Sequence, residues 1–219
     1  MYHPKPYQKC EMPEFSGTLG VLVLNGSLKH KSESSNTEEL AELVIENMKS
    51  HSEIDYEIIR LADKNIPAGL GFKESEDDEW PKIAEKIKKA DIVLFASPIW
   101  WGGRSSLMQR IIERMDAFDE EYIHGGRNTL LNKVAGIVIT GSEDGAQATL
   151  SSLMSMLTFM NFALPPQCAA YWVGEVGQDP KDDRERRLKN KAVENMAKTM
   201  ARNLVFYAKL LKDHPIIEK

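Results

Sequence analysis

Short apolar runs alternate along the chain with amphipathic stretches of helical spacing. Three of these runs, residues 19–24, 92–96 and 134–140, are nearly continuous and rich in β-branched side chains. Such runs are typical of central strands in a parallel sheet that is covered on both faces. Residues 54–61 and 168–174 mix apolar and polar positions, which indicates edge strands. The pattern therefore predicts five strands.

Amphipathic helices are predicted between and after these strands. Asn36 and Glu39 have the spacing of an N-cap and its capping-box partner, and apolar residues then recur at helical spacing. The last helix carries one long apolar stripe. The predicted helices span about residues 36–48, 81–90, 107–118, 150–160 and 180–212.

Repeated strand and helix units with right-handed crossovers predict an α/β protein with an open, doubly wound sheet. A chain of 219 residues with 42% hydrophobic content can bury one core, so we expect a single domain over residues 18–219. Residues 1–17 form an N-terminal arm in this interpretation. The net charge of −5 is spread along the chain and argues against nucleic acid as a partner.

Cys10 and Cys168 have neither metal-ligand spacing nor the pattern of a disulfide framework, which favours a reducing, cytoplasmic location. The sequence has no apolar signal core and no run of about eighteen apolar residues, so no membrane partner is expected. The acidic run at residues 74–79 lacks metal-ligand spacing and predicts a solvated loop. We expect no metal.

The stretch "NGSLKHKSESSNT", residues 25–37, joins the first strand to the first helix. A helix N-terminus offers free N–H groups and a favourable dipole to a phosphate, and the hydroxyl side chains add donors. The fingerprints of triphosphate and dinucleotide sites are absent, which leaves a single terminal phosphate. The candidate ligands are Ser27, Ser35, Asn36 and Thr37. Alternatively, they are only loop and cap residues.

Two further loops follow predicted strands. "ASPIWWGG", residues 96–103, offers aromatic faces and backbone amides to a flat ring, with one tryptophan facing ligand and the other protein. Alternatively, both tryptophans pack under the sheet or at a subunit contact. "TGSEDGAQ", residues 140–147, allows close backbone approach and offers polar contacts to ring edges, including Asp144. The alternative is an ordinary glycine-rich turn that caps the next helix.

These three motifs, in this order and followed by "LPPQCAAYWVGEVG", resemble the NAD(P)H-dependent FMN reductase branch of the flavodoxin-like superfamily over roughly residues 18–177. The resemblance implies a flavodoxin-like sheet of order 2-1-3-4-5 with FMN at its carboxyl edge. It implies phosphate contacts from Ser27, Asn36 and Thr37. It implies ring contacts from Pro98, Ile99, Trp100, Trp101, Gly102, Thr140, Gly141, Ser142 and Gly145.

The sequence also departs from the family pattern. The phosphate loop carries an insertion, "LKHKSES", whose Lys29, His30 and Lys31 either supply charge to a phosphate or extend into solvent; we expect solvent. Gly103 and Arg104 stand where relatives often have a small residue and proline. "NIPAGLGF" has no cysteine, although some relatives carry an iron–sulfur cluster there, so flavin alone is predicted.

The function implied by the resemblance is an oxidoreductase that passes electrons from NADPH or NADH through FMN to a small acceptor, such as free flavin or a quinone, with ping-pong kinetics. No side chain need act as acid or base. A flavodoxin-type electron carrier and an interaction module without cofactor are the alternatives. Exposed tryptophans, the arm and the terminal helix favour a homodimer or homotetramer.

Overall fold

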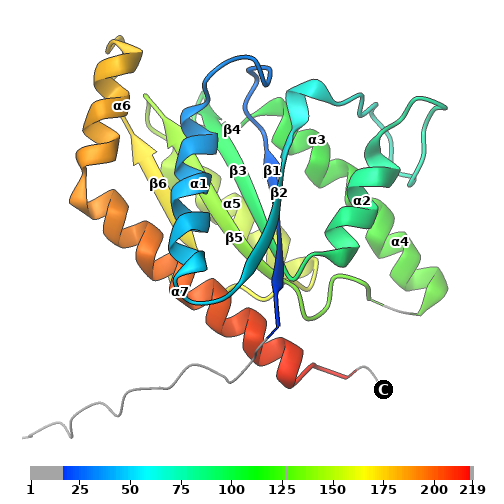
Figure 1. Ribbon diagram of the computed structural model, residues 1–219. Helices are drawn as coiled ribbons and strands as arrows, with labels where there is room; N and C mark the ends of the chain where they lie inside the picture. Colours follow the sequence, from blue (N-terminus) through cyan, green and yellow to red (C-terminus); the bar gives the residue numbers. More distant parts are fainter. Residues whose placement is uncertain (1–16, 127, 218–219) are drawn as a thin grey trace, which may run out of the picture.

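The computed structural model describes residues 17–126 and 128–217, so the predicted arm lies outside the described residues apart from Gly17. The sheet order is β2-β1-β3-β5-β6, with every neighbouring pair parallel (Figure 1). This order confirms the predicted five-stranded flavodoxin-like sheet. The strands are β1 Leu19–Asn25, β2 Ile54–Arg60, β3 Ile92–Trp100, β4 Gly103–Arg104, β5 Val134–Gly141 and β6 Ala169–Val173.

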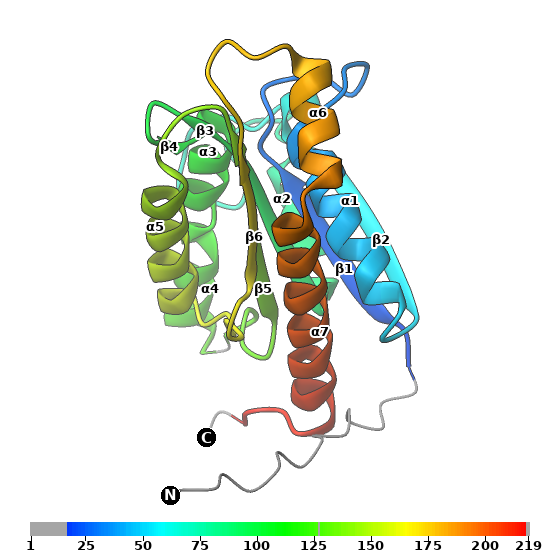
Figure 2. The same ribbon diagram turned by 90° about the vertical axis from the view of Figure 1, so that its left-hand side faces the viewer.

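Helices cover both faces of the sheet (Figure 2). The α-helices are α1 Asn36–Lys49, α2 Trp80–Lys89, α3 Ser106–Arg114, α4 Asp116–Gly125, α5 Ala146–Phe159, α6 Pro180–Lys189 and α7 Lys191–Asp213, and η1 Leu61–Asp63 is a 3-10 turn. One apolar cluster joins α1 and α7 to the sheet, and a second joins α2, α3, α4 and α5 to its other face. Burial of both faces explains why the central strands are continuously apolar.

The structure adds a short strand that the pattern did not predict. β3 continues to Trp100, and β4 folds back antiparallel to it, with Ile99 opposite Arg104. Between them, Trp101 and Gly102 have φ values of 48° and 77°. Two consecutive positive φ angles are typical of the type I′ turn, whose twist suits a two-residue hairpin. The second motif is therefore the end of a strand and a hairpin turn.

Two of the predicted helices are divided. The segment 107–118 forms α3 and α4, which meet at Met115. The segment 180–212 forms α6 and α7, because Asn190 adopts an extended conformation and its side chain accepts two N–H groups from the first turn of α7. The long C-terminal helix is thus α7, with α6 as a separate helix before it. No helix in the described ranges combines the length and apolar character needed to cross a bilayer.

Candidate functional site

The loops that follow β1, β3, β5 and β6 enclose a cavity of about 440 Å³ at the carboxyl edge of the sheet. Most of the predicted ligand residues line it, whereas Gly102, Asp144 and Gly145 do not. The predicted residues on its wall are Ser27, Ser35, Asn36, Thr37, Pro98, Ile99, Trp100, Trp101, Thr140, Gly141 and Ser142. The topology therefore brings the three motifs together, as expected for the edge of a doubly wound sheet.

The N-terminus of α1 forms one end of the cavity. Ser35, rather than the predicted Asn36, is the N-cap, and its Oγ accepts the N–H of Glu38 at 3.3 Å. The cap is one residue earlier because Ser35 is extended, whereas Asn36 already lies in the helix. The N–H groups of Asn36 and Thr37 donate to no acceptor among the described residues, as expected at a helix start. They are suited to an anion.

Hydroxyl groups add donors at the same end. Ser27 Oγ accepts the N–H of Lys29 at 3.3 Å, and Ser27 and Ser35 are almost fully buried. Because a hydroxyl oxygen that accepts a hydrogen bond still carries its own proton, each serine keeps a donor for a ligand. Thr37 Oγ1 lies 2.7 Å from Thr140 Oγ1, which connects α1 to the end of β5. The donor set fits a phosphate group.

The insertion in the first loop folds onto the end of β2. Arg60, with a side chain only 5% exposed, donates to the carbonyl oxygens of Lys29 and His30 at 3.0 and 2.9 Å. His30 Nδ1 lies 2.8 Å from Asp63 Oδ1, but its side chain stays 65% exposed, as expected for an insertion that extends into solvent. Arg60 Nε also donates to Glu38 Oε2 at 2.9 Å. Burial raises the pKa of Glu38, but hydrogen bonds from Arg60 and Asn25 outweigh it, and the pKa lies below its usual value.

Two indole rings also line the cavity. Trp100 is 49% exposed and Trp101 is 92% exposed, and both line the wall. The tight hairpin turn holds both outside the core, and the assignment of one indole to ligand and the other to protein stays a prediction. The N–H of Trp101 donates to Glu143 Oε1 at 2.6 Å. This contact joins the second loop to the third and occupies an amide that was predicted to be open.

The glycines outside the cavity wall allow the two ring-side loops to approach each other. A Cβ atom at Gly145 would lie 2.5 Å from the Cα of Gly102, and Gly145 has a φ of 127°. Only glycine has both the space and the backbone freedom for this contact. A Cβ at Gly141 would likewise lie 2.8 Å from the Cβ of Ile99. The structure thus gives these residues a packing role, and contact with flavin stays a prediction.

A fourth segment, between β6 and α6, completes the wall and was not among the predicted ligands. It follows the carboxyl end of a strand, which is the signal that could have found it. Asp183 accepts the side-chain N–H of Trp172 at 2.8 Å and that of Asn36 at 3.1 Å. One N–H of the Asn36 side-chain amide is therefore occupied, and its backbone N–H remains for a ligand. Lys29 and Glu143, which the loop motifs already offered as polar contacts, also line the wall, and the residues missed are Leu28, Glu175, Val176, Gly177, Gln178, Pro180 and Asp183.

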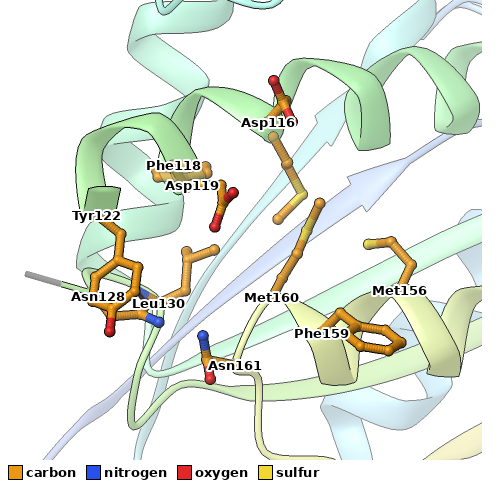
Figure 3. A pocket seen from close by; sticks show the side chains of 11 residues that line it. Asp116, Phe118, Asp119, Tyr122, Asn128, Leu130, Met156, Phe159, Met160 and Asn161 are labelled. Atoms are coloured by element: carbon orange, nitrogen blue, oxygen red, sulfur yellow. Dashed lines mark hydrogen bonds between the residues drawn. The ribbon is translucent and has the colours of Figure 1, made fainter. Parts of the chain in front are cut away.

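A second cavity, of about 320 Å³, lies between α4 and α5 (Figure 3). Its side chains include Met156, Phe159 and Met160 from the end of α5 that is remote from the ligand loops. None of the predicted ligand residues lines it. Within residues 17–126 and 128–217, no group of three or more histidine, cysteine, aspartate or glutamate side chains is arranged to hold a metal ion.

An open parallel sheet of this order, with anion donors and aromatic rings at its carboxyl edge, defines a flavodoxin-like flavoprotein. The chain belongs to the NADPH-dependent FMN reductase family, whose model matches residues 19–176. This match confirms the resemblance stated above. It also confirms, at the level of the family, an FMN-dependent oxidoreductase that uses NAD(P)H.

Individual relatives differ in how much of their length the chain matches. The chain is 29% identical to 8-demethyl-8-aminoriboflavin-5′-phosphate synthase of Streptomyces davaonensis, over 90% of this chain and 80% of that protein. It is 33% identical to the divalent metal cation transporter MntH of Mycobacterium bovis, over 77% of this chain but only 25% of the transporter. The chain thus spans about a quarter of that relative.

A solved structure shows the same fold. The crystal structure of RosB with bound 8-demethyl-8-formylriboflavin-5′-phosphate is similar with a TM-score of 0.77 and 29% identity, over 90% of this chain and 82% of that one. The apo form of an NADH:FMN oxidoreductase is similar with a TM-score of 0.61 at 18% identity, over 88% of this chain and 89% of that one, which concerns the fold alone.

Proposed function

We propose that the protein passes electrons from NADPH or NADH through FMN to a small acceptor, such as free flavin or a quinone. The observation that carries this proposal is the composition of one cavity. Free helix N–H groups, serine hydroxyls and two exposed indoles line the same cavity. Its volume of about 440 Å³ is in the range of small-molecule sites, roughly 300–1,000 Å³.

Each side chain has a binding role in this proposal. Ser27, Ser35 and the N–H groups of Asn36 and Thr37 hold the phosphate. The hairpin at Trp100 and the loop after β5 hold the ring. When bound, FMN accepts hydride from the nicotinamide and passes the electrons on. In this proposal the residues on its wall bind and orient the cofactor.

The exposure of Trp101 supports the predicted ping-pong kinetics. Trp101 is 92% exposed, so the cavity is open to solvent at this residue. Donor and acceptor can therefore occupy the same face in turn. Steady-state rates measured at several concentrations of both substrates test this order, and lines that intersect in the double-reciprocal plot would contradict it.

A second candidate function is chemical modification of a flavin 5′-phosphate. It is favoured by the 29% identity to 8-demethyl-8-aminoriboflavin-5′-phosphate synthase across 90% of the chain. Under this proposal the flavin is a substrate that leaves changed. Mass spectrometry of the flavin recovered after turnover separates the two candidates: unaltered FMN supports the reductase, and a flavin of new mass supports the modifying enzyme.

We also propose that the protein is a homo-oligomer. Phe159 is 85% exposed and Tyr122 is 41% exposed, and both line the cavity of Figure 3. Large exposed apolar side chains close together are typical of a contact surface. Analytical ultracentrifugation is expected to give a dimer or tetramer, and a monomer at micromolar concentration would contradict the proposal.

The experiment that tests the proposed site is FMN binding, measured by the quenching of flavin fluorescence. We expect a saturable complex of one FMN per chain. Thr140→Val, which removes the hydroxyl contact with Thr37, should weaken it. Lys191→Ala, at an exposed residue remote from the cavity, is the control. Absence of binding by the unmodified protein would overturn the proposal.

A further inference from the structure

Helix α6 is attached to the rest of the protein by polar contacts. Its sequence, "PKDDRERRLK", contributes no side chain to either apolar cluster of the described residues. In Figure 2 it stands above α7 and beside the upper end of α1, where the phosphate donors lie. Arg187 is its one buried residue. Because apolar burial does not hold α6 in place, its position depends on what Arg187 and its neighbours contact.

The guanidinium of Arg187 is directed at the first turn of α1. Its side chain is only 2% exposed. Nη2 donates to Glu39 Oε2 at 2.7 Å and to Asn36 Oδ1 at 3.1 Å, and Nη1 approaches the carbonyl oxygen of Asn36 at 3.4 Å. Asp183, four residues earlier on α6, accepts the Asn36 side-chain N–H at 3.1 Å. The two α6 residues thus hold Asn36 by its side chain and its backbone.

The negative charges in the first turn of α1 give the contact between Arg187 and Glu39 a second role. Glu38 and Glu39 stand in the first turn of α1, next to the donors for the phosphate, where an unpaired carboxylate would repel an anion. Glu38 is paired with buried Arg60, and Glu39 with Arg187 and the exposed Arg184. Lys29 is the one basic side chain on the described part of the cavity wall. The buried arginines therefore balance the carboxylates rather than bind the ligand.

The titration of Glu39 agrees with this geometry. Burial raises the pKa of Glu39, but hydrogen bonds from Arg187 and Arg184 outweigh it, so the pKa lies below its usual value. The carboxylate is therefore charged at neutral pH and needs its arginine partners. Arg187 has the better geometry of the two for this purpose, because its guanidinium is buried and screened little by solvent.

We propose that Arg187 is a positioning residue for the 5′-phosphate of the flavin. Through Asn36 it holds the free N–H groups of α1 toward the cavity, and through Glu39 it cancels a neighbouring negative charge. Helix α6 thereby makes the site select phosphorylated over unphosphorylated flavins. This inference rests on the proposed function, because it requires that the cavity binds FMN.

The test compares the dissociation constants of FMN and riboflavin, measured by fluorescence quenching with the full chain. Arg187→Ala is expected to lower the preference for FMN by about tenfold or more, because a hydrogen-bonded charge is lost, while riboflavin affinity stays within about threefold. Arg187→Lys keeps the positive charge but lacks the planar guanidinium group, so it should restore part of the preference for FMN over riboflavin. Lys189→Ala is the matched control, because Lys189 is exposed on the same helix and pairs with Glu185.

Several results would overturn the inference. One is an unchanged ratio of the two dissociation constants in a folded Arg187→Ala protein, as judged by circular dichroism. Another is equal weakening of both ligands, which indicates a structural role alone. If Arg187→Ala does not fold, Glu39→Gln decides: it removes a negative charge near the phosphate and should raise the preference for FMN, and an unchanged or lower preference contradicts the inference.

The same measurement separates this inference from the proposed function. If the unmodified protein binds neither flavin, the proposed function fails, and the inference fails with it. If it binds FMN more tightly than riboflavin and the Arg187 variants keep that preference, the proposed function stands and only the role of α6 is wrong.

Discussion

Replacing Gly145 by alanine should separate the two ring-side loops of the cavity. Gly145 precedes α5 with a φ of 127° and a ψ of 0°, which L residues rarely adopt. The added Cβ would lie 2.5 Å from the Cα of Gly102 and 2.7 Å from its carbonyl carbon. These are backbone atoms, so no side-chain rotation relieves the contact. The hairpin turn at Trp101 and the start of α5 must move apart.

Two effects should lower the stability of the Gly145→Ala protein. Backbone strain at such an angle costs about 1–3 kcal/mol, and an overpacked contact costs roughly 1–3 kcal/mol more. The free energy of unfolding of Gly145→Ala should therefore fall by about 2–6 kcal/mol in urea titrations. If the two loops separate instead, the strain is relieved but the cavity loses its shape. The free energy of FMN binding should then weaken by a similar amount, about 2–6 kcal/mol. Both quantities must be measured on one preparation.

Two other glycines serve as controls for this prediction. Gly102 has a φ of 77° but open space around its Cβ position, so Gly102→Ala tests backbone strain alone. Its free energy of unfolding should fall by about 1–3 kcal/mol. Gly125, at the end of α4, has open space and no unusual φ, so Gly125→Ala should be neutral or stabilising by up to about 1 kcal/mol. If Gly145→Ala loses no more stability or FMN affinity than Gly102→Ala, the close contact of the loops is refuted.

Three further predictions concern the core, acid stability and the phosphate end. Gly136→Ala would place a methyl group 2.6 to 2.8 Å from side chains of β3 and α7 and should cost about 1–3 kcal/mol in urea unfolding, without a change in FMN affinity. Because the pKa values of Glu38 and Glu39 lie below 4.5 in the folded state, their stabilising contribution is present above pH 4.5 and is lost on further acidification. Urea unfolding should follow this course, and a midpoint that is constant from pH 6 to pH 3 would contradict it. Thr37→Val loses the contact with Thr140 and should raise the FMN dissociation constant about tenfold, with a smaller effect on riboflavin; equal effects on both would refute it.

The strands of the sheet could be predicted because burial on both faces leaves a direct trace in the sequence. Val23, Leu94 and Ile137 are fully buried within apolar runs, and such runs have few alternatives to a central strand. The hairpin at β4 could not be predicted in the same way. The hairpin depends on a positive φ at Trp101, and tryptophan ordinarily avoids this conformation. The N–H of Trp101 also donates to Glu143, which belongs to the loop after β5 and is distant in sequence.

The helix boundaries show a different limit. The apolar stripe of residues 180–212 continues from Leu188 to Ala192 and suggests one helix. In the structure Leu188 is 54% exposed, because the chain changes direction at Asn190, and the apolar face starts only with α7. Periodicity reports which positions are apolar, but not whether the backbone between them stays helical. The cap at Asn190 ends one helix and begins the next.

The three loops that line the cavity were predictable because each follows its own strand, so local motifs locate them. The residues that position those loops were not, because they come from distant parts of the chain. Asp183 contacts Asn36 across 147 residues of sequence, and Arg187 contacts Glu39 across 148. Arg60, at the end of β2, reaches the insertion of the first loop. No local pattern signals such contacts; only the parallel register of the strands brings them together.

The most direct test of the central claim is an anaerobic titration of the FMN-loaded protein with NADPH and with NADH, followed by visible absorption. We expect FMN to bind and at least one nicotinamide to bleach its absorption stoichiometrically, with the colour restored by a quinone or free flavin. If FMN binds but neither nicotinamide reduces it, the protein is an electron carrier rather than a reductase. If FMN does not bind, the assignment of the cavity is contradicted.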